Sequence, residues 1–161
     1  MVIRNTRTDD MDAVLNIYAE ARKYMRESGN LEQWANGYPA KEDVLSDIAE
    51  GASYVCEDGG EVVAVFYFKE GTDPTYVNIY EGEWQNGDPY AVIHRIAVKY
   101  HGRGIVNFCF SECFGRFPNL KIDTHKDNIP MQKCLLRCGF EYCGIITTWN
   151  GEPRCAYQKI K

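Results

Sequence analysis

Two glycines that flank an arginine, Gly102-Arg103-Gly104, join a β-forming run over 91–98 to an apolar helical stretch over 105–117. Glycine lets the backbone turn tightly and approach a ligand, and the first N–H groups of the following helix have no partner within that helix. The positive end of the helix dipole points to the same place, and Arg103 adds a mobile cation. The pattern therefore predicts a binding site for a phosphate group.

The details of the turn narrow the choice of phosphate ligand. A Rossmann fingerprint needs a third glycine where this chain has Asn107, and the Gly-Lys-Ser/Thr of a P-loop is absent. The stretch resembles the acyl-CoA signature of the GCN5-related N-acetyltransferase (GNAT) superfamily, a strand ending in hydrophobic-Ala-Val followed by Q/R-x-x-G-x-G/A. Here Ile96-Ala97-Val98 precedes the hexad over 101–106, with His101 and Val106 departing from the pattern at its two ends. A glycine turn that only connects strand and helix is the alternative.

A second stretch supports the resemblance. Asn128-x-x-Met131-x-x-Cys134-Leu135-x-x-x-Gly139-Phe140 is similar to the family's N-x-x-A-x-x-x-Y-x-x-x-G-F segment. Gly139-Phe140 alone would also suit the end of a helix with a hydrophobic contact. Together the two motifs and the order of elements cover nearly the whole chain.

Hydrophobic periodicity and turn residues predict the elements themselves. The expected strands are 2–4, 53–56, 62–68, 91–98, 120–124, 139–148 and 154–160, and the expected helices are 9–26, 41–50, 105–117 and 128–137. Hairpins imply antiparallel pairs, whereas the strand-helix-strand unit over 91–124 implies one right-handed parallel crossover. We expect a single domain over 1–161 of the α/β class: a mixed, mostly antiparallel sheet with helices on both faces, as in the GNAT fold. The long irregular stretch over 70–89 is expected to be functional.

Composition limits the function classes. The 161 residues carry a net charge of -5, which argues against nucleic acid as a main partner. No apolar run is long enough to span a bilayer, and the N-terminus lacks the apolar core of a signal peptide, so we expect a cytoplasmic protein without membrane association.

The seven cysteines call for a structural or a chemical explanation. Their number is odd, no C-x-x-C occurs, and the pairs Cys109/Cys113 and Cys134/Cys138 lack nearby histidines. Because free cysteine behaves as a small buried apolar residue, we expect core packing and no metal site, with a thiol-metal protein as the alternative.

The resemblance implies acetyl-CoA as co-substrate and assigns residues to it. Ile96, Ala97 and Val98 would pair with the pantetheine arm, and the N–H of Ala97 or Val98 would polarise the thioester carbonyl. The pyrophosphate would lie on His101, Gly102, Arg103, Gly104, Ile105 and Val106, with Asn107 in the first helical turn. Asn128 would approach the far side of the arm, although a plain helix cap also explains it.

His94 is the expected general base. By the period of a strand its side chain shares a face with Ile96, and an unperturbed imidazole titrates close to neutral pH. The stretch over 93–98 also resembles the histidine-bearing strand of the arylalkylamine N-acetyltransferases. The alternative is a half-buried histidine bonded to a neighbour. Arg95 would then point to the opposite face and have a structural ion pair.

A general acid is harder to find. The family's tyrosine falls on Leu135, which cannot donate a proton. Tyr142 is the substitute that we expect, although it also suits a sheet aromatic, and Cys138 and Cys143 lie nearby in the sequence. Alternatively the CoA thiolate leaves without an acid. His125, at the end of its strand, could line the site, but we expect it at the surface.

The acceptor site should form from the first two helices and the long loop, with Trp34, Tyr38, Tyr80 and Trp84 as its walls. Aromatic rings with carboxylates suit a cationic amine. We therefore expect an N-acetyltransferase that moves an acetyl group from acetyl-CoA to a primary amine of a small molecule, by direct attack in a ternary complex. A protein or peptide N-acetyltransferase and a non-catalytic acyl-CoA sensor are the alternatives, and the resemblance allows a homodimer.

Overall fold

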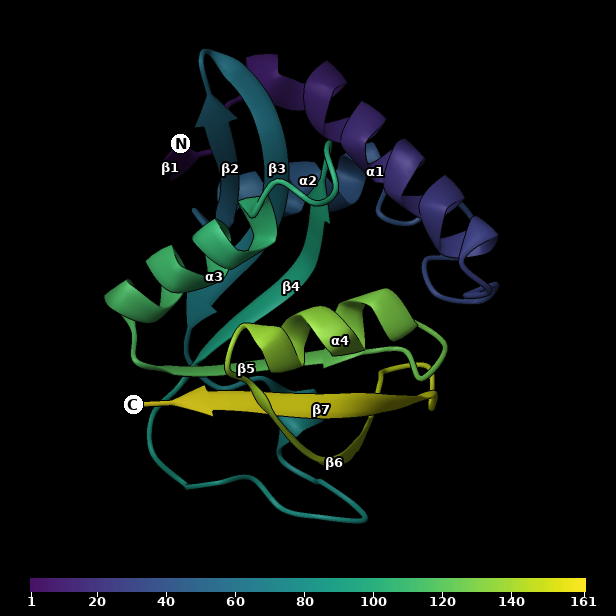
Figure 1. The fold of residues 1–161 in the computed structure, drawn as a ribbon, viewed down its shortest axis with the longest axis vertical. Coiled ribbons are helices and arrows are strands. Elements are labelled where there is room, and N and C mark those ends of the chain that lie inside the picture. The colour runs from purple at the N-terminus through teal and green to yellow at the C-terminus, as the bar shows by residue number, and fades with distance from the viewer.

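The computed structural model describes residues 1–161, and every predicted helix and strand is present with ends that shift by a few residues (Figure 1). The strands are β1 (Val2–Asn5), β2 (Ser53–Asp58), β3 (Glu61–Glu70), β4 (Ala91–Val98), β5 (Asn119–Thr124), β6 (Glu141–Thr147) and β7 (Pro153–Ile160). The α-helices are α1 (Met11–Glu27), α2 (Lys41–Ala49), α3 (Ile105–Arg116) and α4 (Ile129–Arg137), with two 3-10 turns, η1 (Thr8–Asp10) and η2 (Pro74–Tyr76).

All seven strands form one open sheet in the order β1-β2-β3-β4-β5-β7-β6. Strands β4 and β5 are parallel and are joined through α3, whereas every other neighbouring pair is antiparallel. The predicted mixed sheet with one parallel crossover is therefore confirmed.

The two parallel strands separate soon after they meet. They pair only at Ala91 with Leu120 and at Val92 with Lys121. Beyond these pairs the edge of β4 that faces β5 has no strand partner, although backbone N–H and C=O groups normally require one. This gap in the middle of the sheet is where a ligand could add hydrogen bonds.

A β-bulge re-aims the side chains of β4. Val65 pairs with Ala97 and Tyr67 pairs with His94, so Arg95 and Ile96 together oppose a single residue of β3. Arg95 takes a left-handed backbone, with φ of 53°, which is uncommon outside glycine. Ile96 consequently packs in the core beside α3, whereas His94 lies on the other face against Tyr67 and Tyr76. The expectation that His94 and Ile96 share a face was wrong, because the extra residue shifts the alternation.

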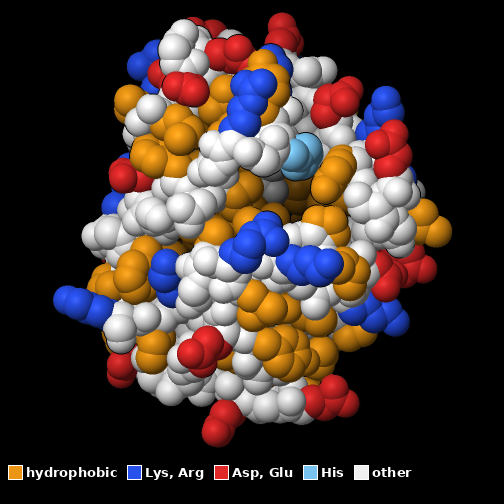
Figure 2. Space-filling view, in the orientation of Figure 1, with side chains coloured by type: hydrophobic (Ala, Val, Ile, Leu, Met, Phe, Trp, Pro, Cys, Tyr) orange, Lys and Arg blue, Asp and Glu red, His pale blue; other side chains and the backbone are white.

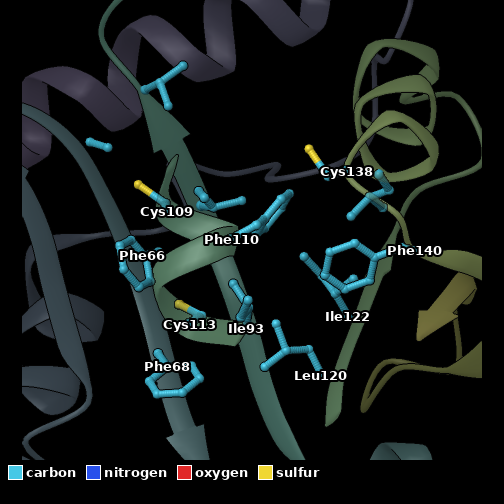
Figure 3. Packing of buried hydrophobic residues seen from close by; sticks show 14 of the residues in the cluster. Phe66, Phe68, Ile93, Cys109, Phe110, Cys113, Leu120, Ile122, Cys138 and Phe140 are labelled. Carbon is cyan, nitrogen blue, oxygen red and sulfur yellow. The ribbon is translucent and has the colours of Figure 1, made fainter. Parts of the chain in front are cut away.

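One face of the sheet carries the main core, beneath α3 and α4 (Figures 1 and 3). Phe66 and Ile93 from the strands meet Cys109 and Phe110 of α3, and Phe140 stands edge-on to Phe110 at 5.1 Å between ring centroids. Burial of these aromatic and branched side chains fixes α3, and with it the turn that precedes it.

The opposite face is covered in two different ways. Helices α1 and α2 cover β2, β3 and the end of β4 through Val14, Tyr18 and Val44. Over the remaining strands the segment 71–90 replaces a helix, and Tyr76 lies buried there with Val92. This division leaves a space on the same face between the helices and the segment.

The segment 71–90 is anchored firmly to β6 and β7. Gln85 N–H donates to Gln158 Oε1 at 2.8 Å, and Tyr80 forms a backbone bridge with Ile145. At Gly82 the backbone of the segment approaches the backbone of β6 so closely that a Cβ would lie 2.0 Å from the carbonyl oxygen of Cys143. Most of this segment therefore closes the core of the C-terminal half of the sheet.

The cysteines serve mainly as core residues, as predicted. All seven are free thiols, and six of them are buried. The Sγ atoms of Cys134 and Cys138 lie 4.0 Å apart on α4. No group of three or more His, Cys, Asp or Glu side chains is arranged to hold a metal ion. None of the helices is both long enough and apolar enough to cross a membrane.

Candidate active site

Two hollows meet at the gap between β4 and β5. We call the first, with a volume of about 640 Å³, the apolar groove, and the second, of about 790 Å³, the charged cavity. Both are lined by Met25, Ile96, Asn128 and Met131, and these four residues define the throat between them. Figure 2 views the face with α3 and α4 and shows a hollow with apolar side chains inside it and Lys and Arg side chains beside it.

The apolar groove contains nearly all of the predicted cofactor residues. Gly102 and Gly104 both have φ of 74°, a left-handed conformation that glycine adopts at little cost, and α3 begins at Ile105 directly after them. The predicted residues that line the groove are Ile96, Ala97, Val98, His101, Gly102, Gly104, Ile105, Val106, Asn107 and Asn128. Arg103 is the exception, since its guanidinium lies over the ring of Tyr100 at 4.2 Å.

Residues distant in sequence complete the groove. Tyr24 on α1 stacks on His101 with 4.1 Å between ring centroids, and Arg137 on α4 supplies a cation. The helical spacing of α1 predicted its amphipathic character but not that its C-terminal half would reach the glycine turn. An extended acyl chain has a free strand edge, apolar walls and helix-terminal N–H groups available here, and these features fit the pantetheine and pyrophosphate of CoA.

Asn128 has two structural partners. Its Oδ1 accepts from the N–H of Met131 at 3.2 Å and caps α4, and its Nδ2 donates to Gln33 Oε1 at 3.0 Å. Gln33 also accepts from Asn30 Nδ2 at 2.7 Å. The predicted helix cap is therefore confirmed, and the cap ties the loop after α1 to the throat.

His94 lies in the charged cavity between two carboxylates. Its Nε2 is 2.7 Å from Asp73 Oδ2, and its Nδ1 is 3.8 Å from Asp123 Oδ2. All three side chains are largely shielded from solvent. The bulge at Arg95 turns His94 toward the cavity, segment 71–90 brings Asp73, and β5 carries Asp123.

The hydrogen bonds of Asp73 determine which nitrogen of the His94 imidazole carries the hydrogen. Burial raises the pKa of Asp73, but hydrogen bonds from His94 and Thr75 outweigh it and hold that pKa below its ordinary value. An ionised carboxylate can only accept, so Nε2 carries the hydrogen and the lone pair of a neutral imidazole is on Nδ1. Nδ1 can therefore accept a proton on the side where Asp123 lies.

Tyr76 holds the second carboxylate in place. Its hydroxyl donates to Asp123 Oδ2 at 2.6 Å, and burial together with Asp123 raises the pKa of Tyr76 well above its ordinary value. Asp123 has no Lys or Arg partner. A cationic group in the cavity would therefore meet a positioned and unneutralised carboxylate.

Arg95 has the structural ion pair that the sequence predicts, although it does not point away from the cavity. Its Nη2 is 2.5 Å from Asp47 Oδ2, and its Nη1 donates to the hydroxyl of Tyr38 at 2.8 Å. Burial raises the pKa of Asp47, against the opposing effect of Arg95. The pair joins α2 to the bulge and forms one wall of the cavity.

The four predicted wall aromatics divide into two pairs. Trp34 and Tyr38 line the charged cavity. Tyr80 and Trp84 line neither hollow. Trp84 instead donates from Nε1 to the carbonyl oxygen of Tyr76 at 2.8 Å and covers the ammonium of Lys121 at 4.1 Å. Trp149, in the hairpin between β6 and β7, also lines the charged cavity and was not predicted.

The predicted acid and the predicted surface histidine are placed differently from expectation. Tyr142 is 49% exposed on the edge strand β6, lines neither hollow, and packs against Tyr157. Leu135 is fully buried in the core. His125 is also buried, and its Nδ1 accepts from the N–H of Asp127 at 3.0 Å, because the chain turns there into α4.

The charged cavity is acidic overall. Its carboxylates outnumber its arginines by seven to two. They are Glu32, Asp43, Asp47, Glu50, Asp73, Asp123 and Glu152, against Arg95 and Arg154. Both arginines are paired, with Asp47 and Glu152 respectively. Such a lining raises the local concentration of cations.

Comparison with solved structures finds acetyltransferases whose fold is similar to that of this chain. A GNAT-family acetyltransferase from Streptococcus agalactiae is similar at 32% identity, with a TM-score of 0.91, over 99% of this chain and 95% of its own. A GNAT-family acetyltransferase from Listeria monocytogenes is 20% identical, with a TM-score of 0.69, over 98% of this chain and 93% of its own. A ribosomal-protein-alanine N-acetyltransferase from Brucella melitensis is 18% identical, with a TM-score of 0.65, over the full length of both chains.

No family model and no curated protein matches the sequence. The first of the three structures is nevertheless similar enough in sequence and length to decide the family. The chain belongs to the GNAT family of acetyltransferases. The other two comparisons, both below 25% identity, establish the fold alone.

Proposed function

We propose that the protein transfers an acetyl group from acetyl-CoA to a primary amine of a small molecule, by direct attack in a ternary complex. The observation that carries this proposal is the pair His94 and Asp73, which lies on the charged side of a throat whose other side is a groove suited to CoA. A general base needs access to the acceptor and a fixed orientation, and this pair has both.

The residues of the groove fit the parts of acetyl-CoA. The first-turn N–H groups of α3 and the turn at Gly102 and Gly104 suit the pyrophosphate, and Arg137 adds a positive charge. The free edge of β4 from Ile96 to Val98 suits the amides of the pantetheine arm. Bound there, acetyl-CoA supplies an activated acyl carbon at the throat.

The charged cavity binds and deprotonates the amine. An ammonium group is attracted by the excess of carboxylates and pairs with Asp123, which Tyr76 orients. His94 Nδ1 takes a proton from the ammonium or from the attacking nitrogen, because Nε2–H is committed to Asp73. Asp73 then stabilises the imidazolium that results, as a carboxylate does in other His-Asp pairs.

The size of the cavity supports a small acceptor. About 790 Å³ lies within the range of small-molecule sites, and the rings of Trp34, Tyr38 and Trp149 are among the side chains that line it, which suits an amine. The Brucella protein is named for acetylation of a ribosomal protein, so a peptide N-terminus is the second candidate acceptor. A sensor without activity would have no use for the half-buried His94–Asp73 pair.

The test combines binding with turnover. Acetyl-CoA affinity is measured by calorimetry, and CoA release is followed on a panel of primary amines and on a peptide with a free N-terminus. For His94→Gln we expect turnover to fall roughly 100- to 10,000-fold at unchanged acetyl-CoA affinity. Tyr142→Phe, outside both hollows, is the matched control and should retain activity.

The outcomes separate the candidates. Turnover on small amines that is lost in His94→Gln supports the proposal, whereas turnover only on the peptide selects the second candidate. Binding of acetyl-CoA without turnover on either would favour the sensor. Absence of acetyl-CoA binding would overturn the assignment of the groove.

A further inference from the structure

Arg154 is the arginine of the charged cavity that still has free hydrogen-bond donors. Each nitrogen of its guanidinium is a donor, yet only Nη1 has a protein partner, Glu152 Oε2 at 3.1 Å. Nε and Nη2 are not among the unpartnered atoms that are sealed from solvent, so both are open although the side chain is only 12% exposed. The other arginine, Arg95, is engaged with Asp47 and Tyr38, and its Nε is sealed. Arg154 can therefore bind an anion that enters the cavity.

The strand register places Arg154 beside Asp123. Asp123 of β5 lies directly opposite Ala156 of β7, and Arg154 is two residues from Ala156 along β7. Residues opposite each other, and residues two apart on one strand, share a face of the sheet, so the two side chains are diagonal neighbours. Such neighbours are about 7–8 Å apart, within the reach of a long side chain. Both line the charged cavity.

No ion pair joins these two opposite charges. Asp123 Oδ2 accepts from the hydroxyl of Tyr76 and lies near His94, whereas Arg154 pairs with Glu152. Asp123 Oδ1 has no protein partner and, like the free nitrogens of Arg154, is not sealed from solvent. The cavity thus presents a carboxylate oxygen and guanidinium donors, a short distance apart, to one small molecule.

The acidic excess of the cavity does not provide a second shielded site for an ammonium group. Most of its carboxylates already accept from donors of the protein. They are Asp43, Asp47, Glu50, Asp73 and Glu152. Glu32 is 78% exposed, where water screens its charge. Asp123 is the shielded carboxylate that remains for a cation, so a diamine would find a partner for one of its charges only.

We propose that the acceptor is an amino acid, whose ammonium group pairs with Asp123 while its carboxylate accepts hydrogen bonds from Arg154. This inference rests on the proposed function and narrows its acceptor to an amine that carries a carboxylate a few bonds away. The planar guanidinium matches the two oxygens of a carboxylate. Glu152 is half exposed, so water solvates it when the ligand takes its place on Arg154.

Arg154 determines specificity in this arrangement, whereas His94 keeps the proton transfer. With one anchor at each end, the acceptor nitrogen is held next to Asp123, whose Oδ2 is 3.8 Å from His94 Nδ1. Fixing the nitrogen beside its base removes part of the entropic cost of the attack. A peptide N-terminus has an amide in place of the carboxylate, so Arg154 also separates the two candidate acceptors.

Matched substrates test the need for the carboxylate. CoA release at saturating acetyl-CoA is measured on the common L-amino acids. Each one that is acetylated is compared with the amine that lacks only its carboxylate, such as phenethylamine for L-phenylalanine, and with its amide. We expect the wild type to prefer the amino acid by roughly 10- to 100-fold in kcat/KM, as expected for hydrogen bonds between charged groups.

Variants of the ion pair test whether Arg154 makes this contact. Arg154→Met keeps the apolar stem, and it should raise the KM for the amino acid roughly 10- to 100-fold while the KM for the amine holds. Arg154→Lys should recover part of the loss, since it restores the charge without the fork. Glu152→Gln frees the guanidinium and should lower the KM for the amino acid. Arg7→Met, exposed and outside both hollows, is the control.

The opposite signs exclude a merely structural role. Arg154→Met and Glu152→Gln break the same ion pair, so loss of hairpin structure would move both KM values in one direction. Calorimetry of the amino acid with the CoA-bound protein, in which no transfer occurs, should show the same order of affinities as the KM values.

Equal use of amino acids and their amines, or KM changes of one sign in the two variants, would overturn the role of Arg154 and leave the proposed function intact. Turnover on peptides in preference to amino acids would also overturn it and select the second candidate acceptor. If no amine of any kind is acetylated, the proposed function fails first, and the inference falls with it.

Discussion

The apolar groove and the charged cavity share a throat but are built by different means. The groove relies on backbone, namely a glycine turn, the first turn of α3 and the free edge of β4. The cavity relies on side chains, and its three adjacent residues His94, Asp73 and Asp123 come from β4, an irregular segment and β5. A backbone site depends on consecutive residues, whereas a side-chain site depends on how distant elements are packed together.

This difference predicts that the two sites fail separately. A change of one atom in the cavity should remove turnover and leave binding in the groove unaltered. A change of backbone freedom in the groove should weaken binding and leave the chemistry of a saturated enzyme nearly unaltered. The following variants test this separation, from the largest expected effect to the smallest.

Asp73→Asn should cause the largest loss. The amide keeps the shape of the carboxylate but no longer compels Nε2 to carry the hydrogen, and it does not stabilise an imidazolium. We expect kcat to fall roughly 100- to 10,000-fold with unchanged acetyl-CoA affinity, measured by steady-state kinetics and calorimetry. Asp12→Asn, exposed on α1, is the control. A variant that keeps wild-type kcat would show that the base does not depend on this hydrogen bond.

Gly104→Ala should have the opposite result, a loss of acetyl-CoA affinity with little change in kcat. The residue has φ of 74°, so a Cβ adds a backbone cost of about 1–2 kcal/mol even though no atom lies within 4 Å of it. We expect acetyl-CoA affinity to fall about tenfold, because the turn relaxes away from its bound shape, while kcat at saturation stays near that of the wild type. Gly115→Ala, inside α3 with open space around it, is the matched control and should not weaken binding. Loss of kcat without loss of affinity would break the separation of the two sites.

Lys121→Met should have the smallest effect, and on stability alone. Lys121 lies buried between the rings of Trp84 and Tyr90 at 4.1 and 4.0 Å, and burial lowers its pKa to about 8. Below that pH the ammonium is charged in both the folded and unfolded states, so the full cost of its burial is present. Removal of the charge should stabilise the fold by about 1–2 kcal/mol at pH 7, after the loss of the cation–π contacts.

The pH dependence of Lys121 gives the check. Between about pH 8 and the ordinary lysine pKa of 10.5, the unfolded chain holds a proton that the folded protein has lost. The stability of the wild type therefore rises with pH across this window, and the advantage of Lys121→Met shrinks. Chemical denaturation at pH 7 and near pH 10 measures both. A variant less stable than the wild type at pH 7 would indicate that the aromatic rings outweigh the cost of burial.

The part of the groove that is formed by the strand, the glycine turn and the first turn of α3 could be predicted from the sequence. Ten of its predicted residues line it, because they follow one another along the strand, the turn and the first turn of the helix, or cap the next helix. Arg103 does not line the groove, because its guanidinium packs on the ring of Tyr100. The residue types of the turn do not predict this contact. Tyr24 and Arg137 were missed because only the packing of α1 and α4 brings them there.

The cavity could be predicted only in part. His94 lines the cavity, but its face was assigned wrongly, because the bulge at Arg95 adds a residue that no alternation pattern reveals. Tyr80 and Trp84 were placed in the site because their loop is long and aromatic, yet it is anchored to β6 and β7. Tyr142 was proposed for its nearness to Gly139-Phe140 in sequence, and the strand carries it to the edge of the sheet.

The sequence by itself determined the elements, the order of the fold and the glycine turn with its helix, because periodicity and backbone freedom act over a few neighbouring residues. Only the tertiary structure decided which carboxylates flank His94. Asp73 and Asp123 stand on opposite sides of His94 in the chain, and they meet it because the splayed strands, the bulge and the segment 71–90 are packed into one sheet and its cover. A contact between residues so far apart in the chain depends on the packing of the whole fold. The pattern of neighbouring residues does not predict that packing.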